Sequence, residues 1–97
     1  MIIFSRTANI APGKPAITWS REVAAYMKQK TGVEMRITMP VSGNPWRICF
    51  LGEFENLTAV DALQAKLRGD PKYRELLAKG SDYFIAGSIT DEFWRTV

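Results

Sequence analysis

The chain has 97 residues, of which 46% are hydrophobic, and it carries a formal net charge of +3. This length fits a single domain over residues 1–97, and the hydrophobic share is too high for a disordered chain. The positive charges are scattered along the sequence rather than gathered into a run. Charge alone therefore does not predict a nucleic-acid-binding surface.

The sequence contains no histidine and one cysteine, Cys49. The lack of histidine excludes Ser-His and Cys-His nucleophile pairs, the facial-triad iron site and histidine-ligated haem. One cysteine argues against a zinc site and excludes an internal disulfide, so we expect no metal, no cofactor and a reducing, cytoplasmic location. No signal peptide or membrane-spanning stretch is predicted, and no membrane contact is expected.

The first half of the chain predicts a strand, a helix and a hairpin. Residues 1–10 alternate as in a strand, and residues 15–30 carry hydrophobic residues at helical spacing before Gly32. Residues 33–41 and 46–54 also alternate, and a two-residue turn at Gly43–Asn44 would join them. This turn predicts a register in which Val41 faces Trp46 and Ile37 faces Phe50.

The second half predicts a broken helix and a last strand. The helix begins at Asn56 or Thr58 and is interrupted before Asp70, which would cap a short helix ending at Gly80. Residues 83–90 read as the last strand, and the hydrophobic tail 91–95 is expected to pack against the domain. The order β-α-β-β-α-β predicts an α+β, ferredoxin-like fold: an antiparallel sheet with helices on one face.

The predicted register places a mixed set of residues on the sheet face away from the helices. A solvated face is one interpretation. We favour a homodimer, because a short chain buries little of its own surface and gains stability when a second copy covers such a face. Glu34 would oppose Glu53, and Arg36 or a second copy would supply the neutralising cation. The dimer-interface candidates are Glu34, Arg36, Arg47, Leu51 and Glu53.

Three segments carry a resemblance to a known family: Ala11-Pro12-Gly13-Lys14, Asp70-Pro71-Lys72-Tyr73 and Phe84-Ile85-Ala86-Gly87-Ser88. With them the chain resembles the dimeric α/β-barrel superfamily, which includes NIPSNAP-like and antibiotic-biosynthesis-monooxygenase-like proteins. The resemblance implies two facing sheets in a dimer and ligands between the sheet and the helices. It also implies a relation to cofactor-independent oxygenases of aromatic substrates. The histidine of the haem-degrading members has no counterpart here, and no catalytic residue is carried over.

Two polar residues interrupt the hydrophobic faces under the helices. Arg6 shares its strand face with hydrophobic residues, and Ser20 lies on the hydrophobic face of the first helix. We hypothesise a pocket for an anionic or aromatic small molecule. Alternatively, Arg6 reaches the surface and Ser20 bonds to a backbone carbonyl one turn back. The pocket candidates are Arg6, Trp19, Ser20, Tyr26 and Trp46.

Two function classes follow from this sequence. The first is a homodimeric small-molecule-binding domain, extending to a monooxygenase-like enzyme without a cofactor. The second is a non-catalytic interaction or structural dimer that has no substrate. RNA-recognition motifs share the element order, but Cys49 and Leu51 stand where such motifs need aromatic residues, so no nucleic-acid partner is expected.

Overall fold

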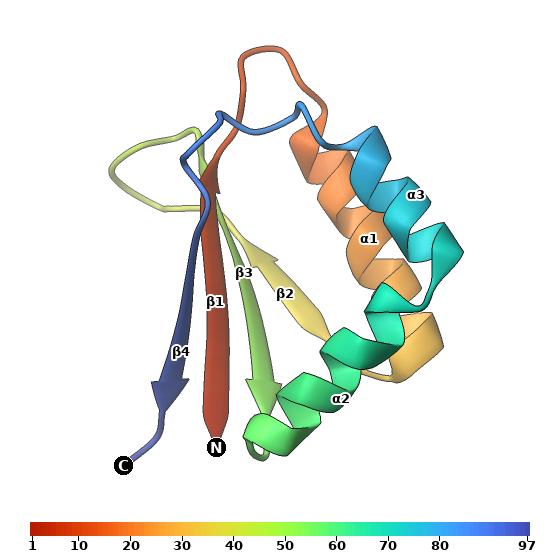
Figure 1. The fold of residues 1–97 in the computed structure, drawn as a ribbon. Coiled ribbons are helices and arrows are strands. Elements are labelled where there is room, and N and C mark those ends of the chain that lie inside the picture. Colours follow the sequence, from red (N-terminus) through yellow and green to blue (C-terminus); the bar gives the residue numbers. More distant parts are fainter.

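The computed structural model describes residues 1–97 as one four-stranded antiparallel sheet with three helices on one of its faces (Figure 1). The strands run in the order β2-β3-β1-β4. This arrangement confirms the predicted ferredoxin-like α+β fold. In chain order the elements are β1 (Ile2–Asn9), α1 (Ala16–Thr31), β2 (Met35–Thr38), β3 (Arg47–Phe54), α2 (Leu57–Arg68), α3 (Pro71–Lys79) and β4 (Thr90–Arg95).

The helix ends lie where the capping residues predict them. Gly32 follows α1 in the left-handed conformation, with φ of 76°, which glycine adopts at low cost. The Asn56 side chain accepts a hydrogen bond from the backbone of Ala59 and so caps α2. Asp70 caps α3 and accepts from the backbone of Tyr73. None of the helices is long and apolar enough to cross a lipid bilayer.

The register of the β2–β3 pair is the predicted one. Ile37 lies opposite Phe50, and pairing ends where Thr38 lies opposite Cys49. The two-residue turn was a wrong prediction, because residues 39–46 form a loop instead. Pro40 has no backbone N–H to give to a sheet, which favours early termination of β2.

The loop 39–46 leaves two hydrophobic side chains in solvent. The Asn44 side chain accepts a hydrogen bond from the backbone of Trp46, which shapes the end of the loop. Val41 and Trp46 were expected to pair, but both are exposed. The pattern of alternating hydrophobic residues therefore continues past the end of the strand.

The last strand lies further along the chain than predicted. Residues 83–89 form a connection that touches the sheet at one bridge, between Ile10 and Phe84. Gly87 has a φ of 80°, so the chain turns there rather than continuing as a strand. The tail expected to pack against the domain is itself the edge strand β4, paired with β1.

The hydrophobic core is small and divided. Only 15 of the 97 residues are buried, and seven of them form two separate hydrophobic clusters rather than one. One cluster lies near the end of β1 and the other near its start. The middle of β1 is therefore not covered by core residues. The clusters are Ala8, Ile10, Ala16 and Ile48, and Ile2, Phe54 and Val60.

Candidate functional site

A cavity of about 470 Å³ lies between the sheet and the helices. Of the 25 residues that line it, 19 are hydrophobic. These residues come from several elements, which include strands β1 and β3 and all three helices. Leu77, Ile85, Ile89 and Phe93 belong to the lining and are also exposed, so the cavity opens to solvent. A volume of this size is within the range of small-molecule sites, roughly 300–1,000 Å³.

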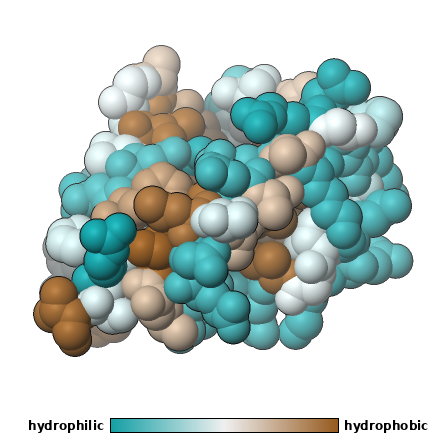
Figure 2. Space-filling model, turned by 60° about the horizontal axis from the view of Figure 1, so that its bottom comes forward, coloured by the Kyte–Doolittle hydropathy of each residue, from teal (hydrophilic) through white to brown (hydrophobic).

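The packing of the helices explains why this space exists. Helix α1 packs against β2 and α2 packs against β3, whereas α3 packs on the other two helices. The central strand β1 is thus left without a helix directly on its middle. Seen from the end that holds both chain termini, the molecule has hydrophobic surface at its middle, framed by hydrophilic residues (Figure 2).

Arg6 is the only charged residue that lines the cavity. Its Nε and Nη2 atoms donate to the two carboxylate oxygens of Asp91, at 2.7 and 2.8 Å. This bidentate hydrogen bond raises the pKa of Arg6 above its ordinary value, so the guanidinium is always charged. The ion pair is about two-fifths exposed, at the edge of the cavity rather than in its depth. Arg6 thus both lines the cavity and reaches solvent.

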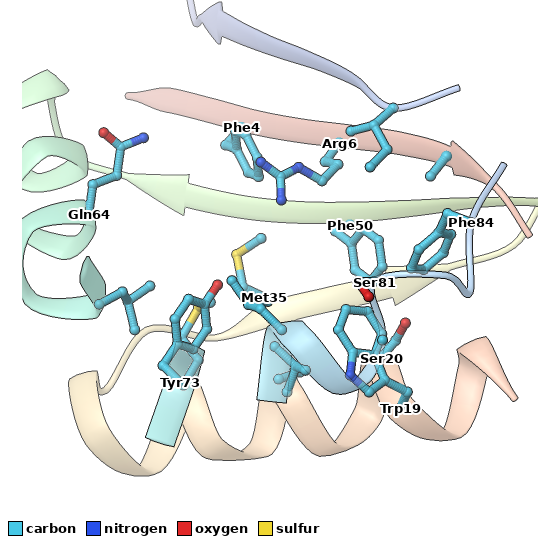
Figure 3. Close-up of a pocket in the computed structure, with 18 of the residues that line it drawn as sticks. Phe4, Arg6, Trp19, Ser20, Met35, Phe50, Gln64, Tyr73, Ser81 and Phe84 are labelled. Atoms are coloured by element: carbon cyan, nitrogen blue, oxygen red, sulfur yellow. The ribbon is translucent and has the colours of Figure 1, made fainter. Parts of the chain in front are cut away.

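Tyr73 reaches the same space from α3. Figure 3 shows Arg6 extending from β1 and the Tyr73 hydroxyl directed from α3 toward the sheet. That hydroxyl has no hydrogen-bond partner in the chain, although Tyr73 is half-buried. Burial raises the pKa of Tyr73, while the nearby charge of Arg6 acts in the opposite direction. The phenol is therefore protonated at neutral pH and has a free O–H donor.

Trp19 forms one wall of the cavity. Its Nε1 atom donates to the backbone carbonyl of Leu76 at 2.8 Å. The indole also meets Phe84 in an edge arrangement, with ring centroids 5.6 Å apart. These contacts fix Trp19 between α1, α3 and the segment that follows α3. It presents a rigid apolar surface to the cavity.

Ser20 lines the cavity, but its hydroxyl hydrogen is not available to a ligand. Its hydroxyl donates to the carbonyl of Ala16 at 2.6 Å, one helical turn back. This is the alternative that the sequence left open, and it satisfies a nearly fully buried group. Ser20 therefore contributes shape rather than a polar contact.

Two pocket candidates lie outside the cavity lining. Tyr26 is buried, and its hydroxyl donates to Asp70 at 2.7 Å, which ties α1 to the start of α3. Trp46 lies in the exposed loop and is 60% accessible. The expectation that both converge with Arg6 is wrong, because the early end of β2 and the cap of α3 direct them elsewhere.

The cavity also has polar members that sequence reasoning did not single out. Tyr73 was not among the pocket candidates. Its spacing to Leu76 and Leu77, three and four residues on, was a usable signal, because that spacing places Tyr73 on the hydrophobic face of α3. Gln64 and Ser81 complete the polar part of the lining.

The helices cover one face of the sheet (Figure 1), and the strand registers place the dimer-interface candidates on or beside the other face. Arg36 faces Leu51 across the β2–β3 pair, and its guanidinium contacts Glu53 at 3.3 Å. Arg47 lies on the same face, since it alternates with the buried Ile48. Glu34 precedes β2 and contacts Lys28 at 3.4 Å. The role of these residues in assembly stays a prediction.

Another hydrophobic residue lies on this face. Trp94 of β4 is paired with Ile3 of β1, and its side chain is 55% exposed. Sequence reasoning missed it because the last strand had been placed before residue 91. No cluster of three or more cysteine, aspartate or glutamate side chains is arranged to hold a metal ion.

The β-α-β-β-α-β order and the four-stranded antiparallel sheet place the chain in the class of small α+β proteins with a ferredoxin-like fold. Solved structures with this fold include a NIPSNAP domain protein from Burkholderia xenovorans, 18% identical with a TM-score of 0.82, covering 100% of this chain and 95% of that one. A NIPSNAP family protein of unknown function from Agrobacterium tumefaciens is 20% identical with a TM-score of 0.78, covering 100% and 88%.

A third similar structure is that of a protein from Nitrosomonas europaea, which carries the provisional name antibiotic biosynthesis monooxygenase. It is 12% identical with a TM-score of 0.74, covering 100% of this chain and 99% of that one. At such identities the likeness concerns the fold alone. No protein-family model matches the sequence, and no curated protein is similar to it.

Proposed function

We propose that this protein binds a largely apolar small molecule in the cavity between its sheet and helices. The observation that carries this proposal is the cavity itself: about 470 Å³, lined by 19 hydrophobic residues, in a domain of only 97 residues. A domain this small gains stability from close packing, so an open apolar space at its centre is costly unless it serves a ligand. A purely structural dimer would not need this space.

A pair of Val→Trp substitutions tests the proposal. Val23 lines the cavity from α1, and Val41 is fully exposed in the loop 39–46. The uncharged dye N-phenyl-1-naphthylamine fluoresces more strongly in an apolar site. We expect it to bind the parent and the Val41→Trp protein alike, and to bind Val23→Trp about tenfold or more weakly, because the indole fills the space. Equal binding by all three proteins would refute the proposal.

An oxygenase that acts on the bound molecule without a cofactor is a second candidate. The fold likeness to the Nitrosomonas protein favours it, as does the resemblance of the sequence to a superfamily whose members include oxygenases of aromatic substrates. Consumption of O₂ with a dihydroxynaphthalene, above the rate of spontaneous oxidation, would support this activity if Val23→Trp abolishes it. Consumption at the background rate would contradict oxygenation of this class of substrate.

A homodimer is the assembly that the sheet supports best. The face without helices carries Trp94, which is 55% exposed, together with the half-buried Ile3, Cys49 and Leu51. Covering this face with the same face of a second copy buries these side chains on both chains. Native mass spectrometry should then show twice the chain mass of 10.9 kDa. A monomer at that mass would contradict the dimer. The cytoplasmic location inferred from the single cysteine belongs to this proposal.

A further inference from the structure

The single positive charge in the cavity lining is already neutralised within the protein when no ligand is bound. Arg6 is the only charged residue in the lining, and two of its three nitrogens are already bonded to Asp91. The pair as a whole is neutral. An anion that approached Arg6 would bring a second negative charge beside Asp91, with no further cation in the lining to offset it.

Arg6 and Tyr73 each keep a hydrogen-bond donor free in the cavity, in addition to the side chains of Gln64 and Ser81 elsewhere in the lining (Figure 3). The Nη1 atom of Arg6 makes no hydrogen bond to the protein, because only Nε and Nη2 contact Asp91. The Tyr73 hydroxyl has no partner either, and its raised pKa keeps it protonated. Ser20 cannot add a third donor, because its hydrogen is given to Ala16. Arg6 and Tyr73 therefore present donors, not charge, to a ligand.

We propose that the cavity selects an uncharged, largely apolar molecule that carries a neutral oxygen acceptor, such as a ketone carbonyl, directed at Arg6 and Tyr73. This inference rests on the proposed function and narrows it. The sequence suggested an anionic or aromatic ligand, and the Arg6–Asp91 pair removes the reason to prefer an anion. The hydrophobic lining accommodates the body of the molecule, and the two donors orient its oxygen.

A matched set of three naphthalenes tests this selectivity. 2-Ethylnaphthalene, 2-acetylnaphthalene and 2-naphthoate share one ring system and differ at a single substituent of similar size. Displacement of N-phenyl-1-naphthylamine reports the affinity of each. We expect 2-acetylnaphthalene to bind most tightly and 2-naphthoate to bind about tenfold or more weakly, because the carboxylate loses its hydration and faces Asp91.

Substitution of Asp91 should reverse the preference. Asp91→Asn removes the balancing charge and leaves the Arg6 guanidinium free to attract an anion. We expect 2-naphthoate to gain about tenfold or more relative to 2-acetylnaphthalene. The control is Asp82→Asn, which removes the same charge from the exposed Lys14–Asp82 pair outside the cavity lining. Both variants raise the net charge equally, so only a local effect distinguishes them.

Tyr73→Phe provides a second test that leaves the ion pair intact. It should lower the affinity for 2-acetylnaphthalene several-fold and leave that for 2-ethylnaphthalene unchanged. The inference is overturned if the parent binds 2-naphthoate as tightly as 2-acetylnaphthalene. It is equally overturned if the Asp91→Asn and Asp82→Asn proteins show the same relative affinity for 2-naphthoate and 2-acetylnaphthalene. Failure of the dye and of every naphthalene to bind the parent would instead refute the proposed function.

Discussion

The side chain of Asp70 connects two helices. One carboxylate oxygen accepts from the backbone of Lys72 and Tyr73 and caps α3, and the other accepts from the Tyr26 hydroxyl at 2.7 Å. The Tyr26 bond is the main cause that lowers the pKa of Asp70 below its ordinary value. The same bond raises the pKa of Tyr26 to about 12. The sequence indicated the cap but not the tyrosine, since their contact spans 44 residues.

These pKa shifts predict how the contribution of Tyr26 to stability depends on pH. Because the pKa of Tyr26 is raised by folding, its stabilising effect is full below pH 10 and is lost as the pH rises toward 12. The pKa of Asp70 is lowered, so its effect is present above its ordinary value of 3.8 and is lost as the pH falls below it. We therefore expect Tyr26→Phe to be less stable than the parent at neutral pH.

Urea unfolding measured between pH 7 and pH 12 checks this prediction. The difference in unfolding free energy between the parent and Tyr26→Phe should be constant up to about pH 10 and shrink above it. Tyr83→Phe is the control, because the Tyr83 hydroxyl has no hydrogen-bond partner in the chain. A Tyr26→Phe protein as stable as the parent at neutral pH would show that the bond to Asp70 does not contribute.

At the scale of elements, the junction of α1 with α3 depends on Gly80. This residue is buried at the end of α3, and a methyl group there would overlap the Trp19 indole, 2.6 Å from its Nε1 atom. The φ of Gly80 is −98°, so the lack of a side chain is needed for space and not for conformation. Gly80 thus allows Trp19 to reach the Leu76 carbonyl and form the cavity wall.

Gly80→Ala should therefore destabilise the protein by about 1–3 kcal/mol, the usual cost of overpacking a well-ordered site. Urea unfolding followed by tryptophan fluorescence measures this change. Gly69→Ala is the matched control, because the nearest atom to its methyl group would be the Ala65 carbonyl oxygen at an ordinary 3.8 Å. That variant should be neutral or slightly more stable. Equal stability of the two variants would show that Trp19 moves aside without cost.

The elements differ in how well local signals predicted them. Gly32, Asn56 and Asp70 act on backbone groups only a few residues away, so the helix ends were predictable. The position of the last strand was not predictable from local signals. Strand β4 is an exposed edge strand, so its alternating hydrophobic side chains contribute little free energy of burial. Its place is set by pairing with β1 and by the Arg6–Asp91 contact, 85 residues apart in sequence.

The candidate site was only partly predictable for the same reason. Arg6, Trp19 and Ser20 belong to elements that were placed correctly, and the structure brings all three to the cavity. Trp46 lies in a loop that was assigned to a strand. Asp91 was placed in a tail, so its pairing with Arg6 did not emerge from the sequence. The places of Trp46 and Asp91 depend on pairing between residues far apart in the chain. A single sequence does not show which distant residues pair.

At the scale of the whole molecule, the divided core makes the uncovered sheet face important for stability. Two clusters of four and three buried residues are a small core for 97 residues. If two copies share the sheet face, folding and association are coupled, and stability rises with protein concentration. A hundredfold increase adds about 2.7 kcal/mol to the unfolding free energy of a dimer. With the usual unfolding entropy per residue, this raises Tm by roughly 6 °C.

Thermal unfolding at two concentrations a hundredfold apart, combined with a matched pair of Leu→Glu variants, tests the coupling. Leu51→Glu places a charge on the sheet face, and two-fold symmetry would bring two such charges into the interface. Leu57→Glu places the same charge at the exposed start of α2, where an acidic residue is favourable. The parent and Leu57→Glu should show the concentration-dependent Tm, and Leu51→Glu should lose it. A parent Tm that does not change with concentration would mean that each chain folds alone, with Trp94 left in solvent.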